Sequence, residues 1–156
     1  MKLLLTAAAV LLSFALWAQP ERYCNTEYGF CLEYPGHFSM LTAKGGAQAP
    51  ALFVSEASQA QVEVSGHSNT DNWSLEDIYY FNFEDHLRRN ADLEILEETF
   101  EEDAFEVLYQ EDGQLHYFRI LRQPGQYVKL SVALPEAQRD ALPALRQQLS
   151  IESPKP

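Results

Sequence analysis

The stretch from Phe105 to Ala133 constrains the fold more than any other part of the chain. It holds three runs with the composition of β-strands, at residues 105–110, 114–122 and 126–133. Asp112-Gly113 and Pro124-Gly125 separate these runs. Both dipeptides suit tight turns, because glycine accepts positive φ angles and proline fixes φ near −65°. The stretch therefore predicts a three-stranded antiparallel meander.

The middle run of this meander is apolar on both faces. Alternation places Leu115, Tyr117 and Leu121 on one face, and Phe118 and Ile120 on the other. A strand of this kind must be covered on both sides. We therefore predict an α+β protein with a central, mostly antiparallel sheet of about six to seven strands. Helices should cover both faces of the sheet, as in an α/β/α sandwich.

Length, composition and charge narrow the class of protein. The 156 residues are 46% hydrophobic and 12% aromatic, which suits one folded domain, predicted over residues 19–152. The formal charge is −12 and the isoelectric point is near 4.6. Such an acidic chain is a poor partner for nucleic acid or for anionic lipid, since both need basic patches. Residues 153–156 should form a frayed C-terminal tail.

The first 18 residues predict a secretory signal peptide. Lys2 precedes an apolar run from Leu3 to Trp17, and small residues follow near its end. Cleavage after Ala18 is preferred and cleavage after Ala15 is the alternative. The mature protein is then exported, periplasmic or secreted, with no stable membrane insertion. Removal of Lys2 leaves ten basic and 23 acidic residues, a formal charge of −13.

The two cysteines of the chain, Cys24 and Cys31, predict a structural disulfide. An exported protein meets an oxidising compartment. If Asn25 pairs with Phe30 around a four-residue loop, the two cysteines lie directly opposite each other. A redox-active pair and a metal site are the alternatives. The first usually has C-x-x-C spacing and the second needs more ligands close by.

Further elements are predicted from local patterns. A helix should begin after Ser74, with Asp77 completing a capping box and the helix running to Arg89. A second helix should have Asp140 as its N-cap, which places Pro143 in the first turn. Strands are expected at residues 37–43, 51–56, 61–65 and 93–98, and a polar loop at residues 66–69.

The segment Tyr28-Gly-Phe-Cys-Leu-Glu-Tyr-Pro35 resembles the opening motif of PsbP-like domains and related small exported bacterial proteins. The approach to the first helix, through Gly66, Asn69 and Ser74, is similar to that of the exported group. The resemblance implies a central antiparallel sheet with helices on both sides and a role as an accessory module. It implies no catalytic residue, since the family shares none. Cys31 departs from the motif, which has a small residue there.

Sequence motifs for catalysis are absent. The chain has no G-x-S-x-G and no H-E-x-x-H, and the histidines (His37, His67, His86 and His116) show no ligand spacing. We therefore predict no metal, no cofactor and no catalytic residue. The predicted function is a non-catalytic binding or accessory module. The alternative is an envelope enzyme whose site is assembled from scattered His, Asp and Glu residues.

Phe81 is the candidate contact for a partner. On a helical wheel it lies opposite the apolar line of Leu75, Tyr79 and Phe83, and Tyr80 lies at the edge of the same polar face. Single exposed apolar residues are common and need no function. The alternatives are a covering loop, a docked protein partner or a homodimer.

Overall fold

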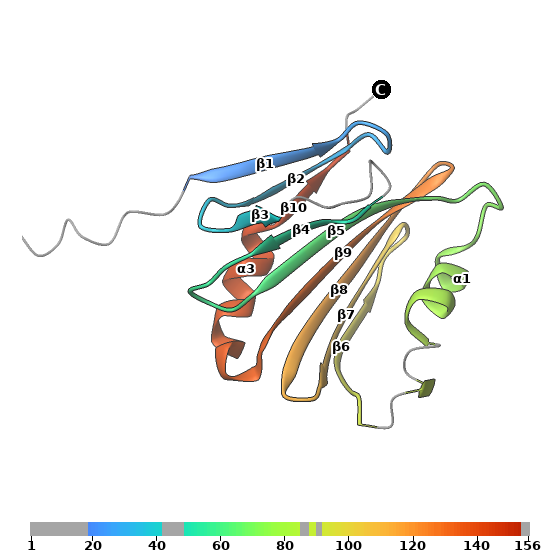
Figure 1. The fold of residues 1–156 in the computed structure, drawn as a ribbon. Coiled ribbons are helices and arrows are strands. Elements are labelled where there is room, and N and C mark those ends of the chain that lie inside the picture. The colour runs from blue at the N-terminus through green and yellow to red at the C-terminus, as the bar shows by residue number, and fades with distance from the viewer. Residues whose placement is uncertain (1–18, 42–48, 85–87, 90–91, 154–156) are drawn as a thin grey trace, which may run out of the picture.

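The computed structural model describes residues 19–41, 49–84, 88–89 and 92–153, which form two β-sheets and short helical segments (Figure 1). The predicted signal peptide lies outside the described residues, as do residues 154–156 of the tail. The bounds of the domain therefore stay predictions. Within the described part, no helix is long and apolar enough to cross a membrane.

The larger sheet has seven strands, and each neighbouring pair is antiparallel. The meander is confirmed, with Asp112, Gly113 and Gly125 at positive φ in its turns. In spatial order the strands are β3 (Ser39–Leu41), β4 (Ala51–Val54), β5 (Gln61–Ser68), β9 (Gln126–Pro135), β8 (Gln114–Gln123), β7 (Ala104–Glu111) and β6 (Glu94–Phe100).

Two strand predictions need correction. The polar loop expected at residues 66–69 is wrong for its first three residues, because β5 continues to Ser68 and pairs with β9 along its length. The strand expected at residues 37–43 begins at Ser39, and its predicted end at Ala43 lies outside the described residues. Polar residues extend β5 because its backbone is paired by a long neighbouring strand, which outweighs local preference.

A second sheet was not predicted. Its strands are β1 (Pro20–Asn25), β2 (Phe30–Pro35) and β10 (Ser150–Glu152), in the order β1-β2-β10. The hairpin of β1 and β2 has the predicted register, with Asn25 opposite Phe30. The strand β10 brings the C-terminal end of the domain beside the hairpin (Figure 1). Three residues from a distant part of the chain carry no periodic signal, so this pairing was missed.

The helices differ in detail from the prediction. The first is α1 (Leu75–Tyr79), with Ser74 as its N-cap and the predicted capping box to Asp77. It continues as a π-helical turn, η1 (Tyr80–Glu84), where a regular helix was predicted. Residues 88–89 are helical, but residues 85–87 lie outside the described residues, so the predicted end of the helix at Arg89 stays a prediction. A 3₁₀ segment, η2 (Glu136–Ala141), precedes α3 (Leu142–Gln148). The N-cap of α3 is Ala141, so the prediction of Asp140 is wrong, although Pro143 does lie in the first turn.

The core is divided into two clusters by the larger sheet. Leu115 and Tyr117 of β8 belong to one cluster, together with buried residues of β2 and α3. Phe118 and Ile120 of the same strand belong to the other, together with Leu75, Ile78 and Phe83 of the first helical segment. These four β8 residues are all buried, as predicted.

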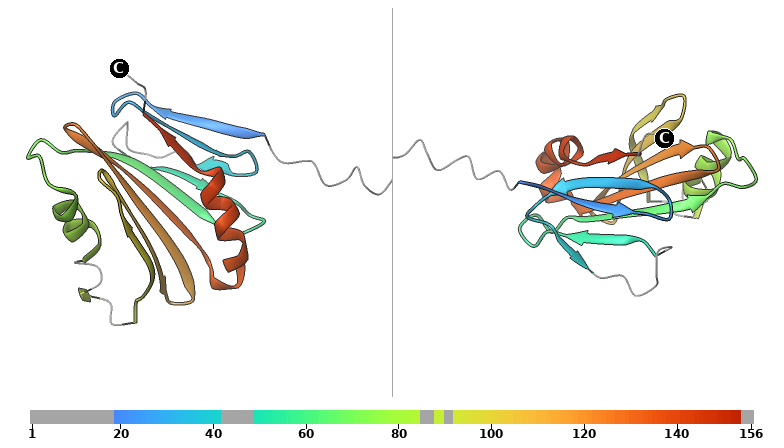
Figure 2. Two further views of the ribbon diagram at one scale, coloured as in Figure 1. Left: turned by 180° about the vertical axis from the view of Figure 1, so that it is seen from behind. Right: turned by 90° about the horizontal axis from the view of Figure 1, so that it is seen from above.

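The class is α+β, with mostly antiparallel sheets and two short helices, as predicted. A plain α/β/α sandwich does not describe the layers fully. On one side of the larger sheet the covering layer contains the three-stranded sheet beside α3 (Figure 2). On the other side it is the short segment α1–η1, which packs on β7 and β8.

The β1–β2 hairpin is fixed to the larger sheet by its loop. The ring of Tyr28 lies against Gly66 of β5 so closely that a Cβ atom there would be 2.2 Å from the ring. The side-chain amide of Gln126 donates a hydrogen bond to the backbone oxygen of Tyr28 at 2.6 Å. Gly66 is therefore required for close approach of the two sheets.

The disulfide is present between Cys24 and Cys31, which pair directly across the hairpin with a Cα–Cα distance of 4.1 Å. We predict that Cys24→Ser/Cys31→Ser lowers the free energy of unfolding by about 2–3 kcal/mol, because the unfolded chain loses a constraint. Urea midpoints measure this loss, with the reduced wild-type protein as control. Alkylation of both thiols in the unreduced protein would contradict the bond.

A core truncation tests burial on the second face of β8. Phe118 is 6% exposed, and its ring packs against Phe83 and Phe105. Phe118→Ala should lower the free energy of unfolding by about 3–5 kcal/mol. The matched control is Phe81→Ala, whose ring is 58% exposed and which should cost about 0.5 kcal/mol or less. Equal losses in urea unfolding would show that the second face is not a core.

Candidate functional site

Two exposed aromatic side chains, Tyr80 and Phe81, and the half-buried Trp73 form a group at α1, here called the aromatic surface. Phe81 is 58% exposed and Tyr80 is 39% exposed. The ring of Phe81 stacks on that of Trp73, with centroids 4.7 Å apart. Tyr80 meets Phe81 edge to face at 5.5 Å. Phe81 thus lies on the surface as predicted, and Trp73 joins it although the sequence did not indicate this.

The local backbone explains why Phe81 points outward. The capping box starts α1 at a defined residue, so Leu75 and Ile78 face the core. The side chain of Asn82 then donates to the carbonyl oxygen of Ile78 at 2.9 Å within the π-helical turn. Phe83 is 2% exposed and fills the core position. Because Ile78 and Phe83 are fixed in the core, Phe81 between them is turned toward the surface.

Charged groups surround the aromatic surface. Glu76, Asp77 and Glu84 lie on the same short segment, and all three are acidic. The guanidinium of Arg88 lies over the ring of Tyr80 at 5.3 Å and also pairs with Glu84 at 2.8 Å. The segment that carries Tyr80 and Phe81 therefore bears three acidic residues, one of which, Glu84, is paired with Arg88.

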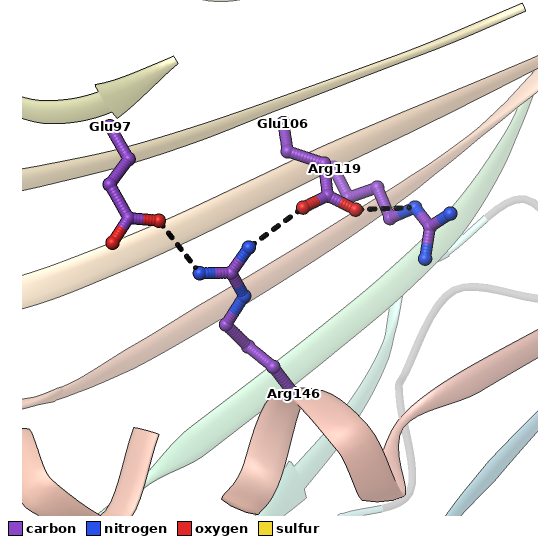
Figure 3. A network of polar contacts seen from close by, with 4 residues as sticks. All are labelled: Glu97, Glu106, Arg119 and Arg146. Carbon is purple, nitrogen blue, oxygen red and sulfur yellow. Dashed lines mark hydrogen bonds and ion pairs between the residues drawn. The ribbon is translucent and has the colours of Figure 1, made fainter. Parts of the chain in front are cut away.

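A cluster of charged side chains lies on the other face of the larger sheet, where α3 meets β7 and β8 (Figure 3). Arg146 of α3 donates to Glu97 at 2.9 Å and to Glu106 at 2.8 Å. Its guanidinium lies 4.5 Å from the centroid of the Tyr117 ring. The second oxygen of Glu106 contacts Nε of Arg119 at 3.2 Å, an ion pair without hydrogen-bond geometry. This network ties α3 to three strands.

The network borders a surface hollow of about 360 Å³, here called the arginine hollow. Burial raises the pKa of Tyr117, and the nearby charge of Glu106 adds to this, so the phenol stays protonated. Burial opposes the charge of Arg146, but its bonds to Glu97 and Glu106 outweigh this and raise its pKa. The lining residues are Glu106, Tyr117, Arg119, Pro143, Arg146 and Gln147.

The histidines do not form one site. His67 contacts Ser65 at 2.9 Å and stacks on Tyr127 at 4.8 Å, whereas His116 stacks on Tyr109. His37 is exposed beside Phe38, and His86 lies outside the described residues. Among the residues that the structure describes, no three His, Cys, Asp or Glu side chains are placed to hold a metal ion.

The distance between Ser65 and His67 is the only feature that this pair shares with a catalytic nucleophile and its base. Ser65 is 6% exposed and lies within β5, where its backbone is paired opposite Lys129. A nucleophile must be reachable by its substrate, and one in an extended strand lacks the free N–H donors of an oxyanion hole. The pair therefore fits a structural hydrogen bond.

The fold is PsbP-like, as the sequence motif suggested. The chain is similar to the solution structure of cyanobacterial PsbP (CyanoP) from Synechocystis sp. PCC 6803, with a TM-score of 0.63 and 15% identity. The match covers 86% of this chain and 94% of that chain. At this identity the likeness concerns the fold alone.

A crystal structure from Bacteroides thetaiotaomicron is also similar, with a TM-score of 0.54 and 13% identity. That match covers 88% of this chain and 49% of that chain, so the fold forms about half of the longer protein. No family model matches the sequence, and no curated protein sequence matches it.

The environment of His67 predicts a pH effect on stability. Burial and the nearby charge of Lys129 lower the pKa of His67 below its ordinary value of 6.5. As the pH falls below about 6.5, the unfolded chain binds a proton that the folded protein does not, and stability declines. His67→Gln should reduce this decline, measured by urea unfolding at about pH 7.5 and about pH 5.5.

The matched control for this experiment is His37→Gln, which changes an exposed histidine. This variant should keep the wild-type loss of stability on acidification. If His67→Gln and the wild type lose equal free energy between the two pH values, His67 does not carry the effect.

Proposed function

We propose that this protein is an exported, non-catalytic accessory module that binds a protein partner through the aromatic surface. The observation that carries the proposal is the exposure of Phe81, which stacks on Trp73 at the surface while its neighbour Phe83 fills the core. Large aromatic side chains dominate the binding energy of protein interfaces. Phe81 serves as the anchor, and Tyr80 and Trp73 extend its contact area.

Export is supported by the predicted signal peptide and by the disulfide. An oxidising compartment maintains such a bond, and a reducing cytosol does not. The PsbP-like fold is consistent with an accessory role, although the likeness alone assigns no partner. The alternative of an envelope enzyme is favoured by no particular group of described residues.

Charge favours a different protein over a second copy of this chain. Each mature molecule carries a formal charge of −13, so two copies repel each other. The acidic residues on the segment that carries Tyr80 and Phe81 suit a partner that has basic residues around an apolar pocket. Complementary charges also make the association weaken as salt rises.

Phe81→Ala tests the proposal, because it removes the anchor and leaves the core intact. The free energy of unfolding should change by about 0.5 kcal/mol or less. Affinity for the partner should fall by about 30-fold or more, the loss of an interface anchor. Capture from an envelope extract identifies the partner, and titration of the two purified proteins measures the dissociation constant.

The matched control is Met40→Ala, which removes a large apolar side chain that is 46% exposed on β3. The control should bind as the wild type does. Equal loss in both variants would contradict a site at Phe81. Self-association that strengthens as salt rises from about 50 mM to about 500 mM would point to a homodimer instead.

A further inference from the structure

Of the two arginines that line the arginine hollow, Arg119 uses fewer of its hydrogen-bond donors. Its Nε contacts Glu106, and Glu106 is the one ionic partner of Arg119 among the residues that the structure describes. Arg146, by contrast, uses both terminal nitrogens on carboxylates. The two terminal nitrogens of Arg119 point away from Glu106 (Figure 3). The outer edge of its guanidinium is therefore not used by any of the residues that the structure describes.

The same contact holds this guanidinium in place. Nε of Arg119 is buried and faces one oxygen of Glu106, while Arg146 holds the other oxygen. The side chain of Arg119 is 29% exposed, so it is partly desolvated without being enclosed. A guanidinium edge that is fixed from behind loses little freedom when it binds a ligand.

The unused edge has the geometry that a carboxylate requires. Two parallel N–H donors of a guanidinium match the two oxygens of a carboxylate. Gln147 also lines the hollow and can offer its side-chain amide as a neutral partner, and Pro143 forms an apolar wall. A volume of about 360 Å³ admits the carboxylate together with a small attached group.

We propose that the arginine hollow binds a monovalent carboxylate, gripped by the two terminal nitrogens of Arg119. Charge selects this ligand over a dianion. Arg119 and Arg146 contribute two positive charges, and Glu97 and Glu106 contribute two negative ones. The network is neutral overall, so a monovalent carboxylate adds one negative charge to it, whereas a phosphate dianion adds two and is repelled more strongly by Glu106.

The carboxylate has two possible sources, a small free acid or the C-terminus of a peptide. The probes are sodium acetate, an N-acetylated Ala-Ala dipeptide with a free carboxylate, and the same dipeptide as its amide. Binding is followed by the NMR shifts of the Gln147 side-chain amide, at constant ionic strength set with sodium chloride. Inorganic phosphate, titrated at a pH well above its second pKa so that it is a dianion, serves as the dianion probe.

We expect saturable shifts with a carboxylate probe and none with the amide or with phosphate. Saturation by the dipeptide acid at lower concentration than acetate indicates a peptide C-terminus, and the reverse order indicates a small free acid. Shifts that never saturate, or equal shifts with chloride alone, overturn the proposal.

Variants locate the effect at Arg119. Arg119→Gln should weaken carboxylate binding by about tenfold or more, since it removes a charged two-point contact. Arg119→Lys keeps the charge but not the fork, and it should also weaken binding. The control Arg139→Gln changes an arginine that is 51% exposed outside the hollow and should bind normally.

If Arg119→Gln unfolds, Arg119→Lys and the wild-type titration still decide the question. Wild-type affinity in Arg119→Lys would show that charge alone matters, which contradicts the two-point geometry. The proposal does not depend on the aromatic surface, so Phe81→Ala should leave carboxylate binding unchanged.

Discussion

The burial of β8 on both of its faces is the constraint on which the rest of the structure depends. Leu115 and Ile120 are both fully buried, although they point to opposite sides of one strand. Burying such side chains contributes about 1.5–3 kcal/mol each, so neither face of the strand can remain in water. Each face needs a covering layer, and the two short helical segments and the small sheet provide them.

These covering layers are made from parts of the chain that would be unstable alone. Helix α3 has seven residues and α1 has five, far below the length at which an isolated helix persists. Leu142 and Leu145 of α3, and Leu149 directly after it, are buried against the sheet. Their packing, and not helix propensity, therefore holds these segments in place.

The sequence predicted the parts of the fold that depend on neighbouring residues. Turns at Gly113 and Gly125, the capping box at Ser74 and the cysteine hairpin each have a local chemical signal. Phe81 was also predicted as exposed, since its place on the helical wheel is a local property. The π-helical turn was not predicted, because it depends on how Phe83 meets the core.

The arginine hollow could not have been found in the sequence. Glu97, Glu106, Arg119 and Arg146 come from four separate elements, and no spacing links them. Each is ordinary on its own in an acidic chain. The same limit applies to β10, whose pairing with β2 joins residues more than one hundred positions apart. Long-range pairing is a property of the fold, and local patterns do not contain it.

The two proposed surfaces differ in physical kind because they lie over different core clusters. The aromatic surface adjoins the cluster of Leu75, Ile78 and Phe83, and its binding energy would come from aromatic area. The arginine hollow lies between α3 and the strands β7 and β8, and there the energy would come from charge-assisted hydrogen bonds. The larger sheet lies between the two surfaces, so a substitution at one should not disturb the side chains of the other. Distant sites without shared contacts act independently. A module of this design has room for a protein partner on one face and a small acidic group on the other.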